Sequence, residues 1–453
     1  MRILVYGAGV LGSLYAARLH DAGHDVTVLA RGERYQQIKA GGVLIQDPRT
    51  GVRSVSLVPT IDRLEPDAVF DAALVLTRRD QVRDVLPPLA AATAIPTVLL
   101  MTNNALGADE YVAALGRERV LLGFPGAGGV REGDVVRARA VSGMLQPTTI
   151  GELDGTTTPR VHEIADVLRS AGFPVAISPR IEAWLTTHAA IVTPAALAVY
   201  AAGGTTHGLA RTPDALVLMI RAVREELGVL RAAGVTIEPR RYRRLFDAPE
   251  PVLVAILRRS LASDRAELGI AGHARVARAE MRTLLDELRT IAARTEVATP
   301  SVDRLASHLD EAVEPIAEGS HEIPVDRRPL RVAATGVVAV GLAAAGVAAW
   351  AVARRRNGSV LPHIEIGTPD LPAALAHVRE AVPQIEIGTP DVPAALAHVR
   401  GSARRLGLRA PYMRVRALRR ATLLASVRPL LARGWPAMTM ARGLLTRVRP
   451  SAA

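Results

Sequence analysis

A glycine-rich turn near the start of the chain carries the most specific chemical signal in the sequence. The turn follows a short apolar run and reads Gly7-Ala8-Gly9-Val10-Leu11-Gly12. Gly7 permits a tight bend, Gly9 lets the backbone approach a pyrophosphate, and Gly12 lets the next helix pack closely on the strand. The first amides of that helix, at Val10 and Leu11, would face the anion with free N–H groups. The spacing therefore predicts a dinucleotide-binding turn.

The end of the second apolar run indicates which dinucleotide the turn would hold. Residues 26–30 read VTVLA, and Arg31 follows them. An Asp or Glu at this point would bind a ribose 2′-hydroxyl, whereas a guanidinium matches a 2′-phosphate in charge and geometry. We therefore expect NADP(H) rather than NAD(H) as the cofactor.

These residues need a framework of strands and helices, and residues 1–178 have the pattern of one. Short apolar runs predict strands at Ile3–Tyr6, Asp25–Leu29, Ala72–Leu76, Thr97–Met101 and Val120–Phe124. Helical stretches such as 11–22 and 81–92 lie between them. This alternation predicts a parallel doubly wound sheet, so we expect an α/β Rossmann domain over residues 1–178. A second glycine-rich loop, Gly126-Ala127-Gly128-Gly129, either lines the cleft or simply connects two strands.

The pattern changes near residue 181. Residues 181–317 read almost wholly helical, and apolar residues recur at a spacing near 3.6 over 221–233 and 271–295. We expect an all-helical domain over 181–317 that serves substrate binding and the formation of a homodimer.

A long apolar run follows the predicted helical domain. Residues 332–353 contain no charge, and three arginines flank them on each side. A helix of this length would measure about 33 Å at about 1.5 Å per residue, which is enough to cross a hydrocarbon core of about 30 Å. We expect a single transmembrane helix here, with the preceding domains in the cytoplasm. A buried soluble helix is the alternative, because ten of the 22 residues are alanine.

The basic charge of the chain lies in its C-terminal tail. The net charge is +12 at pH 7, and residues 354–453 contain 17 arginines against five acidic residues. The tail also holds a duplication, in which residues 364–379 recur at 385–400 with one change. We expect this arginine-rich tail to bind anionic lipid. Two aromatic residues after position 401 make a poor stacking platform, so no specific nucleic-acid binding is expected.

Over about residues 1–315 the chain resembles the ketopantoate reductase (2-dehydropantoate 2-reductase) family. The resemblance rests on the glycine turn, the strand end before Arg31, Leu74-Val75-Leu76-Thr77-Arg78 with Gln81-Val82, Asn103-Asn104-Ala105-Leu106-Gly107, and a helical half entered at Trp184. It implies a two-domain enzyme in which NADPH reduces a 2-oxo acid at the domain cleft. It also implies that Asn104 lies beside the nicotinamide and substrate. Arg78 stands where the family usually has a lysine that touches the cofactor.

The sequence departs from the family at the catalytic lysine, which the family places shortly after the tryptophan. Trp184 is followed here by Leu-Thr-Thr-His188, and Lys39, in the Rossmann half, is the only lysine of the chain. Reducing a ketone requires a proton, or a strong hydrogen-bond donor, for the developing alkoxide. A histidine tuned near neutrality can supply it, so we predict His188 as the donor, with His273 able to approach it.

The sequence also lacks a clear match to the family's glutamate and any pattern for a metal or thiolate site. The glutamate that the family uses to hold the substrate hydroxyl has no clear match, since its region reads Gly272-His273-Ala274. No closely spaced set of His, Asp and Glu predicts a metal site, and the chain has no cysteine for disulfides or thiolate chemistry.

We therefore expect a membrane-anchored, NADPH-dependent reductase that acts on 2-dehydropantoate or a related 2-oxo acid. Two alternatives stay open, and the missing lysine favours both. One is a dehydrogenase of the same scaffold that acts on a different oxo acid through His188. The other is a non-catalytic, membrane-tethered module that binds NADP as a sensor.

Overall fold

Strand β1 (Arg2–Tyr6) lies in the middle of an eight-stranded sheet. The other strands are β2 (Asp25–Leu29), β5 (Thr60–Ile61), β6 (Ala72–Val75), β7 (Val98–Met101), β8 (Val120–Phe124), β11 (Thr148–Gly151) and β12 (Val175–Ile177). The order is β12-β11-β8-β7-β6-β1-β2-β5, and every neighbouring pair is parallel except β8 and β11. The predicted strands are thus confirmed to within one residue at each end. The chain changes its direction across the sheet after β5, so the crevice between β1 and β6 is the topological switch point.

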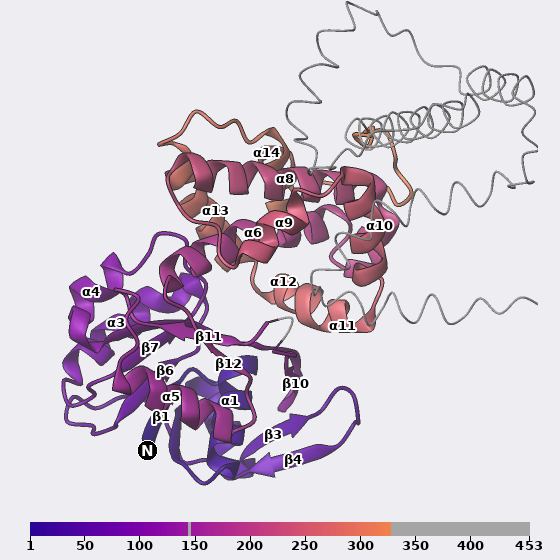
Figure 1. Cartoon of the computed structure of the whole chain (residues 1–453). Coiled ribbons are helices and arrows are strands. Elements are labelled where there is room, and N and C mark those ends of the chain that lie inside the picture. Colours follow the sequence, from indigo (N-terminus) through magenta and orange to yellow (C-terminus); the bar gives the residue numbers. More distant parts are fainter. Residues whose placement is uncertain (144–145, 328–453) are drawn as a thin grey trace, which may run out of the picture. The chain divides into compact units, whose positions relative to one another are not determined.

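The structure is a computed structural model that describes residues 1–143 and 146–327 (Figure 1). Residues Met1–Arg327 form one compact unit, in which an α/β part is followed by a helical part. The predicted transmembrane helix at 332–353 and the basic tail at 354–453, with its duplication, lie outside the described residues.

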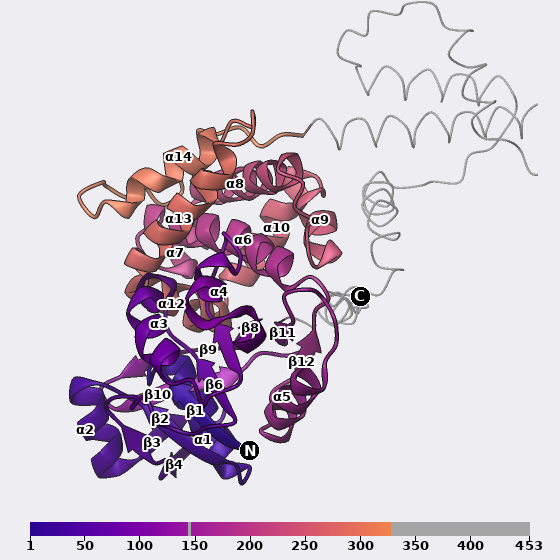
Figure 2. The same ribbon diagram turned by 90° about the vertical axis from the view of Figure 1, so that its left-hand side faces the viewer.

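The alternation of side chains along β1 explains the layers on the two faces of the sheet. Ile3 and Val5 point into one core, and Leu4 and Tyr6 point into the other. The first core is covered by α1 (Val10–Asp21) and α5 (Pro159–Ser170), and the second by α3 (Val82–Ala91) and α4 (Asp109–Leu115) (Figure 2). Two further elements are α2 (Gly32–Gly41), which follows β2, and the short 3-10 turn Arg117–Arg119 before β8. The result is the three-layered Rossmann-like arrangement that the sequence predicts.

A second, smaller sheet was not expected from the sequence. Its strands are β3 (Val43–Gln46), β4 (Arg53–Ser56), β9 (Ala127–Glu132) and β10 (Val135–Ala140), in the order β4-β3-β10-β9. The expected glycine-rich loop at 126–129 is therefore largely strand β9. Its glycines allow close pairing, because a Cβ on Gly129 would lie 2.6 Å from the Cα of Ala138 on β10. Glycine pairs in a sequence do not by themselves distinguish such a strand from a loop.

The helical part begins at α6 (Ile181–Ala201), at the point where the sequence pattern changes. It continues with α7 (Thr206–Arg211), α8 (Pro213–Ala232), α9 (Arg240–Phe246), α10 (Glu250–Leu261), α11 (Asp264–Ala266), a π-helical turn (Glu267–Ala271), α12 (Gly272–Val276), α13 (Arg278–Ala292), α14 (Pro300–Ala306) and a 3-10 turn (Ser307–Leu309). The periodic stretch expected over 271–295 is interrupted, because Ala277 leaves the helical conformation between α12 and α13. A helical second part after the Rossmann-like part is confirmed.

Helix α6 passes through both parts of the unit. Its first turns, at Trp184 and Leu185, pack in the core beneath the sheet, whereas Leu197 and Val199 pack in the helical core. Pro194 lies between these two segments, inside the helix. Among the described residues α6 is the one helix long and apolar enough to cross a membrane. Most of it is buried within the protein, however, as in the core helix of a soluble domain.

A buried ion-pair cluster fastens the two parts together. Arg79, in the 3-10 turn Arg79–Gln81 after β6, donates to Glu287 of α13 at 2.6 Å and to Glu110 of α4 at 2.7 Å. The side chains of Arg79 and Glu287 are only 10% and 6% exposed. Glu287 also accepts the backbone N–H of Ala105 at 2.9 Å. Since removing one partner of a buried pair leaves an uncompensated charge, this cluster is expected to hold the helical part against the sheet edge.

We expect Arg79→Met to lower the free energy of unfolding by about 3–5 kcal/mol, because Glu287 would lose its buried cation. Arg83→Met is the matched control. Arg83 also contacts Glu110, at 3.4 Å, but its side chain is 88% exposed, so its loss should cost less than about 1 kcal/mol. Urea unfolding at pH 7, followed by circular dichroism, measures both. Equal losses in the two variants would contradict the proposed role of the cluster.

Candidate functional site

The glycine turn lies between β1 and α1, at the switch point of the sheet. Gly7 has a φ of 107°, and a Cβ there would lie 2.8 Å from the carbonyl oxygen of Leu76, which follows β6. A Cβ on Gly12 would lie 1.8 Å from the carbonyl oxygen of Gly7. A Cβ on Gly9 would meet nothing within 4 Å. Gly7 and Gly12 are thus required by packing, whereas the space beside Gly9 is open for a ligand to approach the backbone.

The N-terminus of α1 provides hydrogen-bond donors at the same place. Gly9 is the N-cap residue and has no side chain to bond the first amides of the helix. The N–H groups of Val10 and Leu11 have no partner within the helix, because they belong to its first turn. A helix N-terminus with free N–H groups attracts anions such as a pyrophosphate.

Two arginines frame this turn, and sequence reasoning found only one of them. Arg31 is exposed directly beyond the end of β2, and its guanidinium contacts the hydroxyl of Tyr6 at 3.4 Å. Arg34 is 8% exposed and donates to the carbonyl of Ala8 at 3.2 Å and to the hydroxyl of Ser13 at 3.0 Å. Arg34 therefore fixes the glycine turn, while Arg31 is free to meet a ligand from solvent. Arg34 was missed because its role depends on contacts outside its own helix.

Arg78, the predicted cofactor contact, bridges to the helical part. It lies beyond the end of β6 and donates to the carbonyl of Val276, the last residue of α12, at 2.8 Å. It also contacts Asp80 at 3.4 Å. Its guanidinium thus stands between the glycine turn's edge of the sheet and α12, and its role toward a cofactor stays a prediction.

Asn104, the predicted neighbour of the nicotinamide and substrate, is 1% exposed and stabilises its own turn. Its side chain accepts the N–H groups of Leu106 and Gly107 at 3.0 and 3.1 Å and donates to the carbonyl of Gly107 at 2.5 Å. The preceding Asn103 reaches toward the helical part, where its amide donates to Glu280 of α13 at 2.9 Å. The side-chain oxygen of Asn103 is buried and has no partner.

His188, the predicted proton donor, lies in an aromatic environment. Its ring stacks on Trp184, with 5.3 Å between centroids, and lies 4.1 Å from the ring of Phe124 at the end of β8. Burial lowers its pKa to about 4, with a further contribution from nearby His273. His188 is therefore neutral near pH 7, where it can donate a hydrogen bond from one ring nitrogen but carries no surplus proton.

His273 has a different surrounding, because it faces a buried carboxylate. Its Nε2 lies 3.1 Å from Oε2 of Glu280, whose side chain is 2% exposed. The other oxygen of Glu280 accepts the amide of Asn103 and the backbone N–H of Arg79, the latter at 3.1 Å. Burial alone would raise the pKa of Glu280, but the contacts with His273, Asn103 and Arg79 outweigh it and hold that pKa below its usual value. Sequence reasoning found no glutamate for this site, because Glu280 follows the expected 272–274 region and reaches the site from the next helix.

Thr186 of α6 stands two residues after Trp184, where the family resemblance would place a lysine. Its hydroxyl donates to the carbonyls of Ala105 and Glu182 at 3.1 and 3.0 Å. Lys39 lies on α2 and contacts the hydroxyl of Tyr35 at 3.1 Å. Any proton donor among the described residues near Asn103 must therefore come from another residue type.

Two buried polar atoms without hydrogen-bond partners lie at the same edge of the sheet. They are Oγ1 of Thr77 and Oδ1 of Asn103, whereas Nε of Arg78 and Oδ1 of Asp80 form a 3.4 Å ion pair without a hydrogen bond. These residues follow β6 and β7 at their carboxyl ends, where ligands bind in open parallel sheets. Because unpaired buried polar atoms are costly, their concentration here indicates a site that a ligand completes.

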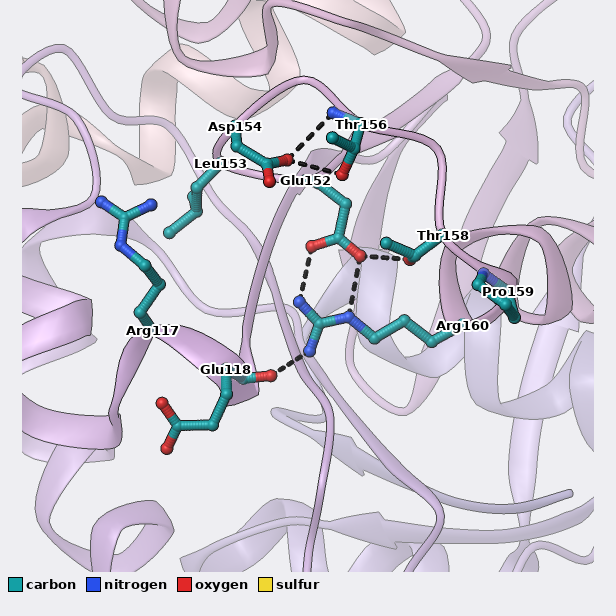
Figure 3. A pocket seen from close by; sticks show the side chains of 9 residues that line it. All are labelled: Arg117, Glu118, Glu152, Leu153, Asp154, Thr156, Thr158, Pro159 and Arg160. Carbon is teal, nitrogen blue, oxygen red and sulfur yellow. Dashed lines mark hydrogen bonds and ion pairs between the residues drawn. The ribbon is translucent and has the colours of Figure 1, made fainter.

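A hollow also lies at the opposite edge of the sheet. It has a volume of about 500 Å³ and is lined by residues near the start of β8 and after β11 (Figure 3). Glu152 and Arg160 form a close ion pair across it at 2.5 Å, and Thr158 also donates to Glu152. The polar groups at its centre satisfy one another, so the glycine-turn edge remains the candidate site.

Known proteins match this chain in sequence and in fold. Residues 3–155 match the family described as ketopantoate reductase PanE/ApbA. A 2-dehydropantoate 2-reductase of Archaeoglobus fulgidus is 32% identical over 38% of this chain and 54% of its own length. An uncharacterized oxidoreductase of Bacillus subtilis is 25% identical over 40% and 59%. The chain thus spans less than two thirds of these relatives.

Solved structures share the fold at low sequence identity. The 2-dehydropantoate 2-reductase of Geobacter metallireducens has a TM-score of 0.56 at 20% identity and covers 69% of this chain and 100% of its own. A D-mandelate dehydrogenase with NADH and anilino(oxo)acetate has a TM-score of 0.56 at 18% identity and covers 68% and 97%. These similarities extend through the α/β part and the helical part together.

The lowered pKa of His188 predicts a pH dependence of stability. The pKa is about 4 in the folded chain against 6.5 ordinarily, so protonation favours the unfolded state. The contribution is fully present above pH 6.5 and is lost as the pH falls toward 4. Between pH 7.5 and 5 we expect a loss of about 2 kcal/mol from this residue. Urea midpoints of the wild type and His188→Gln measure it, because the variant should lose less stability over that range. Parallel pH profiles would contradict the prediction.

Proposed function

We propose, from the match of residues 3–155 to the ketopantoate reductase family, that the protein is an NADP(H)-dependent reductase of 2-oxo acids. The observation that carries the proposal is a single sheet edge with two kinds of group. The open space at Gly9 suits a pyrophosphate. Beyond β7, Asn103 meets the buried Glu280 and the partly exposed His273 of the helical part, a set that suits a polar substrate. 2-Dehydropantoate is the substrate that the family name suggests.

The proposed cofactor site uses residues that the sequence already indicates. Val10 and Leu11 would donate to the pyrophosphate, Gly7 and Gly12 keep the turn closed, and Arg31 would contact the 2′-phosphate. When bound, the reduced nicotinamide supplies a hydride to the substrate. Arg31 is exposed, and it stands at the strand end where an Asp or Glu would bind a 2′-hydroxyl, so the phosphorylated cofactor is favoured.

The proposed substrate site differs from the family at the proton donor. Thr186 cannot act as an acid at neutral pH, so the role falls to an imidazole, for which His188 and His273 are the candidates in the described part of the chain. The proposed place of Asn104 near the substrate fits its role in shaping the turn that follows Asn103. The alternative of a non-catalytic NADP sensor rests on the same departure, the missing lysine.

We also propose that residues 332–353 anchor the chain in a membrane, with the reductase domains in the cytoplasm where NADPH is available. The uncharged run and its flanking arginines support this. Full-length protein should stay in the membrane fraction after a high-salt wash, which removes proteins held by charge alone. Release by salt would contradict the anchor and leave only the arginine-rich tail as a lipid contact.

Stopped-flow oxidation of NADPH tests the proposed reductase. We expect turnover with at least one acid from a panel of 2-dehydropantoate, other branched 2-oxo acids and aromatic 2-oxo acids, and slower turnover with NADH. NADPH binding without turnover on any acid would contradict the reductase and support the sensor. Failure to bind either cofactor would contradict both.

Arg31→Ala separates the two cofactors within the same experiment. Loss of a charge-assisted contact of about 1.5–3 kcal/mol should weaken NADPH binding by roughly 10- to 100-fold and leave NADH binding unchanged. Arg49→Ala, at an exposed arginine in the loop after β3, is the matched control and should change neither. An equal effect of Arg31→Ala on both cofactors would contradict the assignment of the 2′-phosphate.

A further inference from the structure

Two imidazoles lie near the proposed substrate site, and their surroundings give them different capacities. His273 lies on α12 with its Nε2 3.1 Å from Oε2 of Glu280, and its side chain is 38% exposed. His188 lies on α6 between Trp184 and Phe124, with no carboxylate in hydrogen-bond contact. A carboxylate favours the protonated form of an imidazole, whereas an aromatic surrounding favours the neutral form.

Although burial opposes it, the hydrogen-bond contacts of Glu280 lower its pKa and so favour its ionised form. Asn103 and the N–H of Arg79 both donate to its Oε1, and His273 faces its Oε2. The guanidinium of Arg79 is bound to Glu110 and Glu287 and does not pair with Glu280. Of the partners of Glu280, His273 is thus the one that can carry a full positive charge.

Most charged groups on the other elements packed against α12 have other partners. Glu267 of the π-helical turn binds Arg275 and Thr206, and Arg278 of α13 binds Glu311 and the carbonyls of His308 and Leu309. Strand β9 of the small sheet also packs against α12 and carries Arg131 and Glu132, of which Glu132 pairs with Arg137. On α6 the nearby titratable group is His188, whose pKa burial and His273 lower to about 4. Glu280 is therefore the acid in direct contact with His273.

We propose that His273 is the proton donor of the reduction and that Glu280 is the positioning residue that holds its ring. The inference rests on the proposed reductase function and refines it. His188 would then donate a hydrogen bond as a neutral imidazole or serve only to pack against Trp184 and Phe124. His273 would act as a catalytic residue in place of the missing lysine.

The proposed step balances with the groups at hand. The substrate carbonyl carbon accepts the hydride that the cofactor supplies, and the C=O π pair moves to the oxygen. That oxygen takes the proton from Nδ1 of His273, which yields the hydroxy acid. The ring is left neutral with its remaining proton on Nε2, directed at Glu280. The partial exposure of His273 allows solvent to return a proton before the next turnover.

The local backbone supports a functional rather than a purely structural pair. The π-helical turn Glu267–Ala271 leads directly into α12, and such turns are frequent at functional sites. Gly272, beside His273, lies where a Cβ would be 2.5 Å from Val130 of β9, so α12 sits as close to the small sheet as a backbone can. This close contact packs the start of α12, which carries His273, against the small sheet.

The test compares kcat in the full-length protein, with the oxo acid that the wild type reduces. His273→Gln should lower kcat about 100-fold with little change in cofactor binding, because general acid catalysis typically contributes that much. His162→Gln, at an exposed histidine of α5, is the matched control and should keep full activity. In His273→Ala, added imidazole should restore part of kcat, since the vacated position is open to solvent.

Glu280→Gln distinguishes positioning from mere packing. Glu280→Gln should lower kcat with little change in KM or in NADPH binding, because the ring of His273 would no longer be held. In His273→Gln the further change Glu280→Gln should lower kcat no more, since a positioning residue acts only through the ring that it holds. Full activity of His273→Gln, or additive losses of kcat in the double variant, would overturn the dyad while leaving the reductase intact. Wild-type protein inactive on every acid would instead overturn the reductase, and the proton-donor role with it.

Discussion

Arg79 binds two carboxylates from distant parts of the chain, and the geometry of the site depends on that arrangement. Its guanidinium joins Glu110 on α4 to Glu287 on α13, while its own backbone N–H reaches Glu280 two turns earlier on the same helix. The short turn after β6 therefore holds α13 by ion pairs and also donates a backbone hydrogen bond to Glu280. Because the charges are buried, their separation would be costly, so α13 keeps a fixed distance from the sheet edge.

The glycine turn is also held in one conformation, by close packing rather than by ion pairs. Gly12 has no room for a side chain against the carbonyl of Gly7, and Gly7 has none against Leu76. Arg34 then closes the turn from the side by binding the carbonyl of Ala8. Arg31 and His273 are the solvent-accessible side chains that we propose to contact the cofactor and the substrate.

The parts of this structure that local sequence encodes were predictable, and the parts that depend on distant pairing were not. The glycine turn, Arg31 and the buried strands each carry a signal within a few residues. Glu280 carries none, because the side-chain amide that donates to it belongs to Asn103, 177 residues earlier. The small sheet was missed for a similar reason, since β3 and β10 pair across a large separation and β9 is rich in glycine. The family resemblance indicated where to look for the proposed site, and the folded chain identified Glu280 as the carboxylate beside Asn103.

Helix α6 has a consequence for how the two parts can move. Its first turns belong to the core beneath the sheet and its last turns to the helical core, so one continuous helix connects the two cores. Pro194 cannot donate to the carbonyl of Ala190, which leaves one point of low bending stiffness along an otherwise continuous rod. His188 lies on the sheet side of that point. Any flexing at Pro194 would therefore leave His188 with Phe124 and carry the helical core past it, so that the gap between the two imidazoles would change with the bend.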